Sequence, residues 1–133
     1  MYLPGRFALI ASMLTFTLLC VSWRSADART EGPVVRLAEL EIDPLQLENF
    51  KAALKEEIDT SIRAEPGVLT LYAVALKDNP AQIRLFEMYA DADAYKAHLN
   101  APHFQKYKTA TRGMVKSLKL LEADKIVLGA KGK

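Results

Sequence analysis

One stretch of the sequence, residues 85–107, gathers most of the side chains that could carry out acid–base chemistry. Its candidate groups are one carboxylate, several aromatic rings and both histidines of the chain: Glu87, Tyr89, Tyr95, His98, His103, Phe104 and Tyr107. An imidazole ordinarily titrates near neutral pH, so His98 or His103 could remove a proton from a phenol or an α-hydroxy carbonyl compound. The sequence does not choose between the two histidines, and a structural hydrogen-bonding role for both remains open.

Glu87 is the carboxylate placed to share a site with a histidine. Alternate side chains in residues 82–90 face the same way, so Glu87 falls on the more apolar side of the segment. A half-buried carboxylate needs a polar partner, which favours either a pocket role or a structural ion pair. The predicted catalytic residues are His98, His103 and Glu87. The predicted substrate contacts, for which core packing is the alternative, are Tyr89, Phe86, Phe104 and Tyr107.

Metal and cofactor chemistry find little support in the residue types. His98 and His103 stand five positions apart with Pro102 between them, about 140° around an ideal helix, which makes them a poor chelating pair. Cys20, the only cysteine, precedes the predicted domain, and the sequence has no glycine-rich phosphate loop. We therefore predict no metal ion and no bound cofactor.

The first 28 residues have the three parts of a secretory signal peptide. Arg6 supplies the positive start, residues 7–21 the apolar middle, and residues 25–28, Ser-Ala-Asp-Ala, the small-residue end. The apolar run is shorter than the roughly 20 residues that cross a bilayer, and a retained N-terminal anchor is the alternative. We predict a signal peptide at residues 1–28 and one domain at residues 29–133. The mature protein would then be exported, periplasmic or secreted, without a stable membrane anchor after cleavage.

The composition points away from nucleic-acid binding. Hydrophobic residues make up 50% of the chain and charged residues 26%, which is typical of a globular protein. The formal net charge of +2 falls to near +1 when Arg6, Arg24 and Asp27 leave with the signal peptide. This balance provides no basic surface for nucleic acid, so we expect a small-molecule substrate and no nucleic-acid partner.

The elements that must position these side chains alternate between strand and helix. Residues 43–46 begin a helix with a capping Asp and a Pro in the first position, and Glu65-Pro66-Gly67 ends it. Apolar residues recur at steps of three and four and define its predicted buried face: Leu47, Phe50, Leu54, Ile58 and Ile62. The predicted strands are residues 34–42, 68–76, 82–90 and either 115–121 or 125–128. The second helical region covers residues 91–100 and 103–112.

This order of elements is that of the α+β, ferredoxin-like fold (βαββαβ), an antiparallel sheet with helices on one face. Residues 68–76 are apolar on both sides, as in a central strand, and their short link to residues 82–90 predicts an antiparallel hairpin. The second face of such a sheet is left uncovered. We therefore expect a homodimer that covers this face.

The motifs of the chain resemble those of the antibiotic biosynthesis monooxygenase family, also called the quinol monooxygenase-like dimeric α+β barrels. The resemblance extends over about residues 34–121. It rests on Glu87-x-Tyr89 at a strand end, an Asp-rich helix start at residues 91–93, His98-x-x-x-Pro102-His103-Phe104, and Glu65-Pro66-Gly67. It implies ferredoxin-like protomers whose sheets pack face to face in a dimeric α/β-barrel.

This resemblance also implies an activity. The best-known members of the family oxidise phenols or quinols with O₂ and without metal or flavin, because the substrate anion itself donates the electron. The implied function is an exported, cofactor-independent monooxygenase-like enzyme for a quinol, phenolic or small enolisable substrate, with O₂ as co-substrate. The predicted mature chain lacks the tryptophan of the better-studied oxygenases, and its Asn49 falls on a helix, so heme degradation is not expected. An isomerase of a small hydroxy-carbonyl and a non-catalytic dimeric ligand-binding or stress protein are the alternatives.

Overall fold

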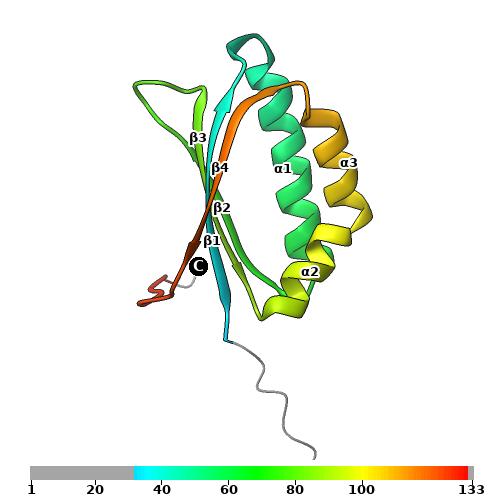
Figure 1. The fold of residues 1–133 in the computed structure, drawn as a ribbon, viewed down its shortest axis with the longest axis vertical. Helices are drawn as coiled ribbons and strands as arrows, with labels where there is room; N and C mark the ends of the chain where they lie inside the picture. Colours follow the sequence, from blue (N-terminus) through cyan, green and yellow to red (C-terminus); the bar gives the residue numbers. More distant parts are fainter. Residues whose placement is uncertain (1–31, 132–133) are drawn as a thin grey trace, which may run out of the picture.

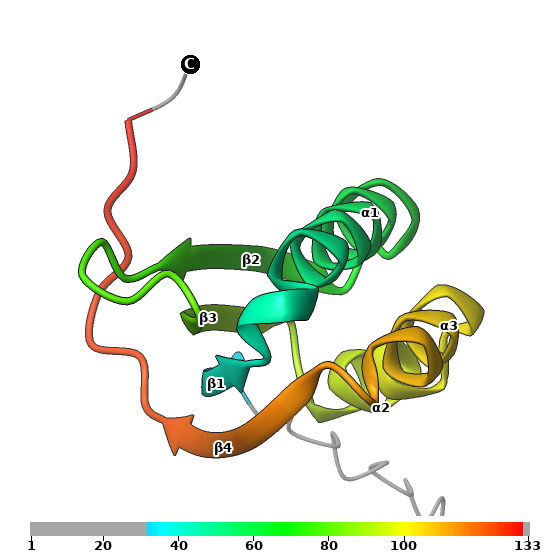
Figure 2. The same ribbon diagram turned by 90° about the horizontal axis from the view of Figure 1, so that it is seen from above.

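The computed structural model describes residues 32–131, so the predicted signal peptide at residues 1–28 lies outside the described residues. The elements follow in the order β1 (Val34–Ile42), the short helix η1 (Pro44–Gln46), α1 (Leu47–Ala64), β2 (Val68–Ala75), β3 (Gln82–Tyr89), α2 (Ala92–Asn100), α3 (Pro102–Thr111) and β4 (Val115–Ala123). The strands form one antiparallel sheet in the order β2-β3-β1-β4, and α1, α2 and α3 lie on one side of it (Figure 1, Figure 2). The predicted ferredoxin-like protomer is confirmed. Within residues 32–131, no helix is both long and apolar enough to cross a membrane.

Helix α1 follows from its cap and from its hydrophobic periodicity. The Asp43 carboxylate accepts a hydrogen bond from the backbone N–H of Leu45 at 3.0 Å, and the chain turns through η1 into α1. The buried residues of α1 are spaced by four, three and four: Phe50, Leu54, Glu57 and Ser61. Ile62, which we predicted on the buried face, is 50% exposed, because the buried stripe follows Glu57 and Ser61 instead. Two polar side chains are thereby carried into the interior.

Strand β2 lies at an edge of the sheet, which corrects the prediction of a central strand. The central strands are β1 and β3. The apolar residues on both faces of β2 do not mean that both faces are covered, since Leu69 and Tyr72 are 46% and 64% exposed. The predicted antiparallel hairpin of β2 and β3 is confirmed, with Leu71 opposite Glu87.

Strand β4 decides between the two predicted positions of the last strand. It begins at Val115 and ends at Ala123, and residues 125–128 form no strand. Leu118 and Leu120 of β4 lie opposite Leu40 and Ala38 of β1, and so they share the helix-covered face of the sheet. Figure 2 shows the chain after β4 running on the other side of the sheet, away from the helices.

The core and one close contact set the position of the helices over the sheet. The buried hydrophobic cluster joins β1, α1 and β3 through Ala38, Leu40, Ile42, Phe50, Leu54 and Ile83. Beyond the end of α1, a Cβ at Gly67 would lie 2.5 Å from Ala94 Cβ, so only glycine allows the chain to approach α2 this closely. This approach brings Glu65, at the end of α1, beside His98 of α2.

Candidate active site

A single carboxylate oxygen connects both histidines of the chain. His98 of α2 is 3% exposed, and its Nδ1 lies 2.9 Å from Glu65 Oε1. His103, on α3, places its Nε2 2.7 Å from the same oxygen. Glu65 caps the C-terminal end of α1, so the carboxylate is fixed by the end of one helix and contacted from two others. The sequence-predicted histidines therefore meet, through a carboxylate.

Two further residues of α1 extend this network inward. Ser61 Oγ donates a hydrogen bond to Glu57 Oε1 at 2.7 Å and lies 3.1 Å from His103 Nε2. Glu57 Oε1 also lies 3.8 Å from His98 Nε2, too far for a hydrogen bond. Within residues 32–131 the recorded hydrogen bond of the His98 ring is made by Nδ1. His98 Nε2 is therefore the ring nitrogen left available.

The two carboxyl groups of the network have opposite electrostatic character. Partial burial alone would raise the pKa of Glu65, but the hydrogen bonds from His98 and His103 outweigh it and hold that pKa below its ordinary value. Burial raises the pKa of Glu57, although the Ser61 hydrogen bond acts in the other direction. An ionised Glu65 only accepts hydrogen bonds, so neutral His98 carries its proton on Nδ1. The lone pair then lies on His98 Nε2, as a general base requires.

His98 and Glu57 both line a cavity of about 300 Å³ between the sheet and the helices. This volume is at the lower end of the range for small-molecule sites and suits a ligand of one or two rings. Apolar side chains from β1, β3, α1 and β4 make up most of its wall. Its polar and aromatic lining includes Glu57, Glu87, Tyr89, Tyr95, His98, Phe104, Tyr107 and Thr111.

Glu87 and Tyr89 form a second polar pair in the same cavity. Tyr89 Oη donates a hydrogen bond to Glu87 Oε2 at 3.0 Å. Burial raises the pKa of Glu87, although this hydrogen bond opposes the effect. Burial and the adjacent Glu87 also raise the pKa of Tyr89 well above its ordinary value, so its hydroxyl remains a donor. The Tyr89 ring centroid lies 5.2 Å from that of His98, which places the pair beside the candidate base.

Comparison with known proteins identifies the family that has this fold. The sequence profile of the antibiotic biosynthesis monooxygenases matches residues 33–110, more than half of the chain. The chain belongs to the antibiotic biosynthesis monooxygenase family.

Solved structures agree with this family assignment. A protein of Bacteroides thetaiotaomicron assigned to the antibiotic biosynthesis monooxygenases is 50% identical with a TM-score of 0.73, and the match covers 78% of this chain and 99% of that one. A protein of Lactobacillus acidophilus assigned as a monooxygenase is 36% identical with a TM-score of 0.66, over 67% of this chain and 42% of that one. A Nitrosomonas europaea protein at 21% identity and a TM-score of 0.68 shares the fold, over 72% and 93% of the two chains. Among curated proteins, none matches the chain.

In this family member, most of the predicted site residues lie together. The cavity is lined by His98, Glu87, Tyr89, Phe104 and Tyr107. His103 does not line it and instead contacts Glu65 and Ser61 behind His98. Phe86 is also absent from the cavity, because alternation along β3 points it to the face away from the helices. The expectation that Phe86 lines the same site is therefore not met.

Glu57, Ser61 and Glu65 were missed as site residues in the sequence. The signal for the first two was present, since Glu57 and Ser61 continue the four–three–four spacing of Phe50 and Leu54. A polar residue on an apolar helix face needs a buried partner, and this requirement could have drawn attention to Glu57. The sequence marks Glu65 as the end of a helix and as part of a family motif, without indicating a site role.

The same cluster also has the residue types of a cation site. Among the described residues, Glu57, His98 and His103 offer ligand atoms that lie within 4.8 Å of one another. Two imidazoles and a carboxylate could hold zinc or iron(II). Ser61, however, already bridges Glu57 and His103 at 2.7 and 3.1 Å, and Glu65 holds both histidines. The contacts are thus those of a closed hydrogen-bond network, and a cation bound by all three residues would have to displace Ser61 and Glu65 from His103 Nε2.

Proposed function

We propose that this family member is an exported, cofactor-independent monooxygenase that oxidises a quinol or phenolic substrate with O₂. One observation carries the proposal. His98 stands in the wall of a cavity, its Nδ1 held at 2.9 Å by Glu65 and its Nε2 available. An imidazole oriented by a carboxylate is a competent general base, because the carboxylate fixes the tautomer and stabilises the imidazolium that forms.

The reaction begins with proton removal. His98 Nε2 accepts the phenolic proton, and the resulting phenolate, far easier to oxidise than the phenol, gives one electron to O₂. The phenoxyl radical and superoxide combine at a ring carbon to form a peroxide. The O–O bond then breaks, so that one oxygen atom stays as a quinone carbonyl. The other leaves as water with the ring hydrogen and the proton held on His98, which balances phenol plus O₂ against quinone plus water.

Two features of the cavity support this chemistry. Its wall is mostly apolar, which excludes water from the radical and peroxide and suits an apolar gas. Tyr89 occupies one oxygen of Glu87 at 3.0 Å, and the other carboxyl oxygen can engage the second hydroxyl of a quinol. Glu87 and Tyr89 would therefore orient the ring while His98 removes its proton.

Oxygen consumption by a substrate panel tests the proposal. Purified protein is incubated with phenols, quinols and small hydroxy-carbonyls, with uptake and ultraviolet spectra recorded against protein-free controls. We expect one O₂ consumed per quinone formed and one labelled atom in the product under ¹⁸O₂, unchanged by chelator. A panel in which no phenol or quinol consumes O₂ above the control would overturn the proposal.

An isomerase of a small hydroxy-carbonyl is the second candidate, and the position of Glu57 favours it. Burial raises the pKa of Glu57, and its Oε1 lies 3.8 Å from His98 Nε2, so an acid stands beside the base. Such a pair can move a proton between two carbon atoms. This activity would exchange the substrate's α-hydrogen with D₂O and consume no oxygen, which separates it from the first candidate.

Export is the part of the proposal that rests on residues 1–28. The positive start, apolar middle and small-residue end motivate it. Protein recovered from a native-like host should have an intact mass that corresponds to a chain starting near Arg29. Full-length protein in the cytoplasm would contradict it.

We also propose a homodimer formed through the sheet face that the helices leave bare. On this face Leu37, Tyr72 and Val74 are 37%, 64% and 39% exposed. The strands that carry them, β1 and β2, lie on either side of β3, and exposed apolar side chains on one face of a sheet favour a protein partner. Light scattering should give twice the monomer mass at micromolar concentration, and Tyr72→Glu should lower it. A monomeric wild type would contradict the proposal.

A further inference from the structure

The two ends of the cavity differ in exposure and in charge. Its closed end is formed by buried residues, among them Glu57, Tyr89 and His98, which are 5%, 0% and 3% exposed. At its other end the lining residues are exposed. They are Lys108 of α3, Arg112 directly after α3, and Leu118 and Leu120 of β4, whose exposed fractions are 55% and 49%. A ligand would enter the cavity through this exposed end.

Lys108 and Arg112 bring two cations without carboxylate partners to this entrance. In the part of the chain that the structure describes, no ion pair within 4.0 Å includes either of them. Lys106, two positions before Lys108 on α3, does have a carboxylate partner. Its Nζ pairs with Glu56 Oε1 at 2.7 Å, outside the cavity. The chain therefore neutralises the lysine beside the cavity and leaves the lysine that lines it available.

Phe104 places the Lys108 cation within one ligand's length of the candidate base. The Phe104 ring centroid lies 4.4 Å from that of His98 and 5.7 Å from Lys108 Nζ. A single aromatic ring packed against Phe104 could present one substituent to each residue. The acidic side chains that line the cavity, Glu57 and Glu87, both belong to its inner part, where no lysine or arginine among the lining residues could pair with an anionic group.

We propose that the substrate is a phenol or quinol bearing a carboxylate, which Lys108 and Arg112 bind at the entrance while the hydroxyl reaches His98. This inference rests on the proposed function for the identity of the hydroxyl-bearing end. Arg112 adds geometric selectivity, because a guanidinium can hold both oxygens of a carboxylate. Binding in the reverse orientation would bring the carboxylate beside Glu57 and Glu87.

Binding of a matched pair of probes tests this inference. The dissociation constants of 2,5-dihydroxybenzoate and of its methyl ester are measured by calorimetry without oxygen, for wild type, Lys108→Gln, Arg112→Gln and the double variant. We expect the acid to bind wild type about tenfold more tightly than the ester, since two exposed ion pairs each contribute roughly a threefold effect. The preference should fall about threefold in each single variant, vanish in the double variant, and weaken in high salt.

Lys106→Gln is the control, because it removes the same charge from the same helix outside the cavity. It should keep the tenfold preference. Equal binding of acid and ester by wild type would overturn the inference, as would a preference that survives the double variant. Oxygen uptake separates this result from the proposed function. Equal turnover of both probes leaves the oxygenase standing without the anion site, whereas selective binding without O₂ uptake leaves the anion site without the oxygenase.

Discussion

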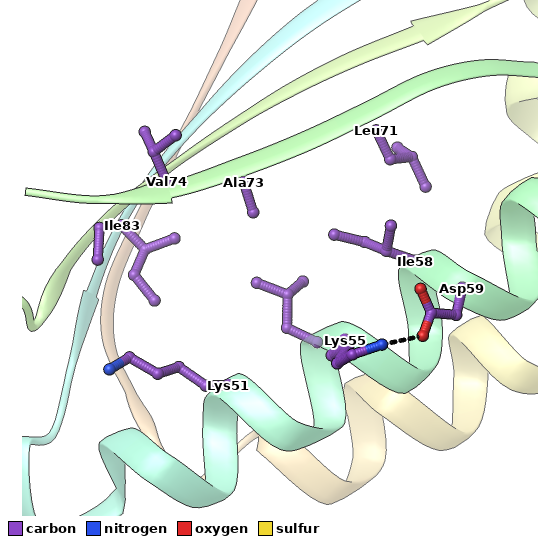
Figure 3. A pocket seen from close by; sticks show the side chains of 10 residues that line it. Lys51, Lys55, Ile58, Asp59, Leu71, Ala73, Val74 and Ile83 are labelled. Atoms are coloured by element: carbon purple, nitrogen blue, oxygen red, sulfur yellow. Dashed lines mark hydrogen bonds and ion pairs between the residues drawn. The ribbon is translucent and has the colours of Figure 1, made fainter. Parts of the chain in front are cut away.

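Two of the hollows on the helix-covered side of the sheet share Leu54 and Leu71 as lining residues. One is the cavity that contains His98, with a volume of about 300 Å³. The other is a groove between α1 and β2, with a volume of about 390 Å³ (Figure 3). Of these two, the groove would be the stronger candidate for a binding site by size alone.

The charged and titratable groups, in contrast, make the cavity the stronger candidate for a binding site. Figure 3 shows Lys55 of the groove directed at Asp59, with which it forms an ion pair, and Lys51 pairs with Glu48 at 2.9 Å. The remaining lining of the groove is aliphatic. The cavity instead holds a buried imidazole with an available nitrogen and two carboxyl groups whose pKa values are raised by burial. A reactive site is distinguished from a gap between elements by titratable groups that are not already paired, more than by its volume.

Of the substitutions in the two hollows, replacement of His98, the candidate base, should have the largest effect on turnover. His98→Gln keeps an N–H that can bond to Glu65 but has no basic nitrogen. We expect it to lower the turnover of the best panel substrate by about a hundredfold or more, the usual contribution of a positioned base. Circular dichroism and a thermal melt establish that the variant is folded. A folded His98→Gln as active as wild type would make the histidine structural.

Glu65→Gln should have the next largest effect, because it keeps an acceptor for His98 Nδ1 and removes the charge. We expect turnover to fall about tenfold to a hundredfold as the imidazolium loses its counter-charge. Stability carries a second signature, since the folded-state pKa of Glu65 lies below its ordinary value of 4.5. The stabilisation by ionised Glu65 is complete above that value and is lost as pH falls through the lowered pKa. Urea unfolding should therefore show the wild-type advantage shrinking in acid, and an advantage independent of pH would contradict the pairing.

Glu57→Gln should have a smaller effect of the opposite sign on stability. Burial raises the folded-state pKa of Glu57 above 4.5, so its contribution is present below that value and is lost as pH rises through the raised pKa. The variant does not titrate. As the pH rises from 4 to 8, the free energy of unfolding of the variant should therefore increase relative to that of wild type. A constant difference across this range would show that Glu57 is not desolvated.

Lys55→Ala, in the groove, should have the smallest effect. Its ion pair with Asp59 is exposed, and exposed pairs contribute at most about 1 kcal/mol. We expect unchanged turnover and a shift of about 0.5 kcal/mol or less in the free energy of unfolding. A loss of turnover comparable to that of the Glu65 variant would return the groove to consideration as the active site.

The sequence predicted the fold better than the site because the two depend on contacts of different range. Caps, turns and hydrophobic spacing are local, so α1 and the hairpin of β2 and β3 were correctly placed. The edge position of β2 depends on strand order, which the two-sided apolar pattern of that strand does not encode. Glu65 lies 33 and 38 residues from His98 and His103, and only the approach at Gly67 brings them together.

The protonation state of each ring nitrogen of His98 decides whether this residue can act as the base. The chain has two histidines, so nitrogen NMR of protein labelled at histidine gives two pairs of ring signals, assigned with His103→Gln. At pH 8, where an imidazole is ordinarily neutral, we expect a protonated Nδ1 and an unprotonated Nε2 for His98. Adding hydroquinone without oxygen should then shift His98 Nε2 far more than either nitrogen of His103. A His98 protonated on Nε2, or a ligand response confined to His103, would show that His98 is not the base.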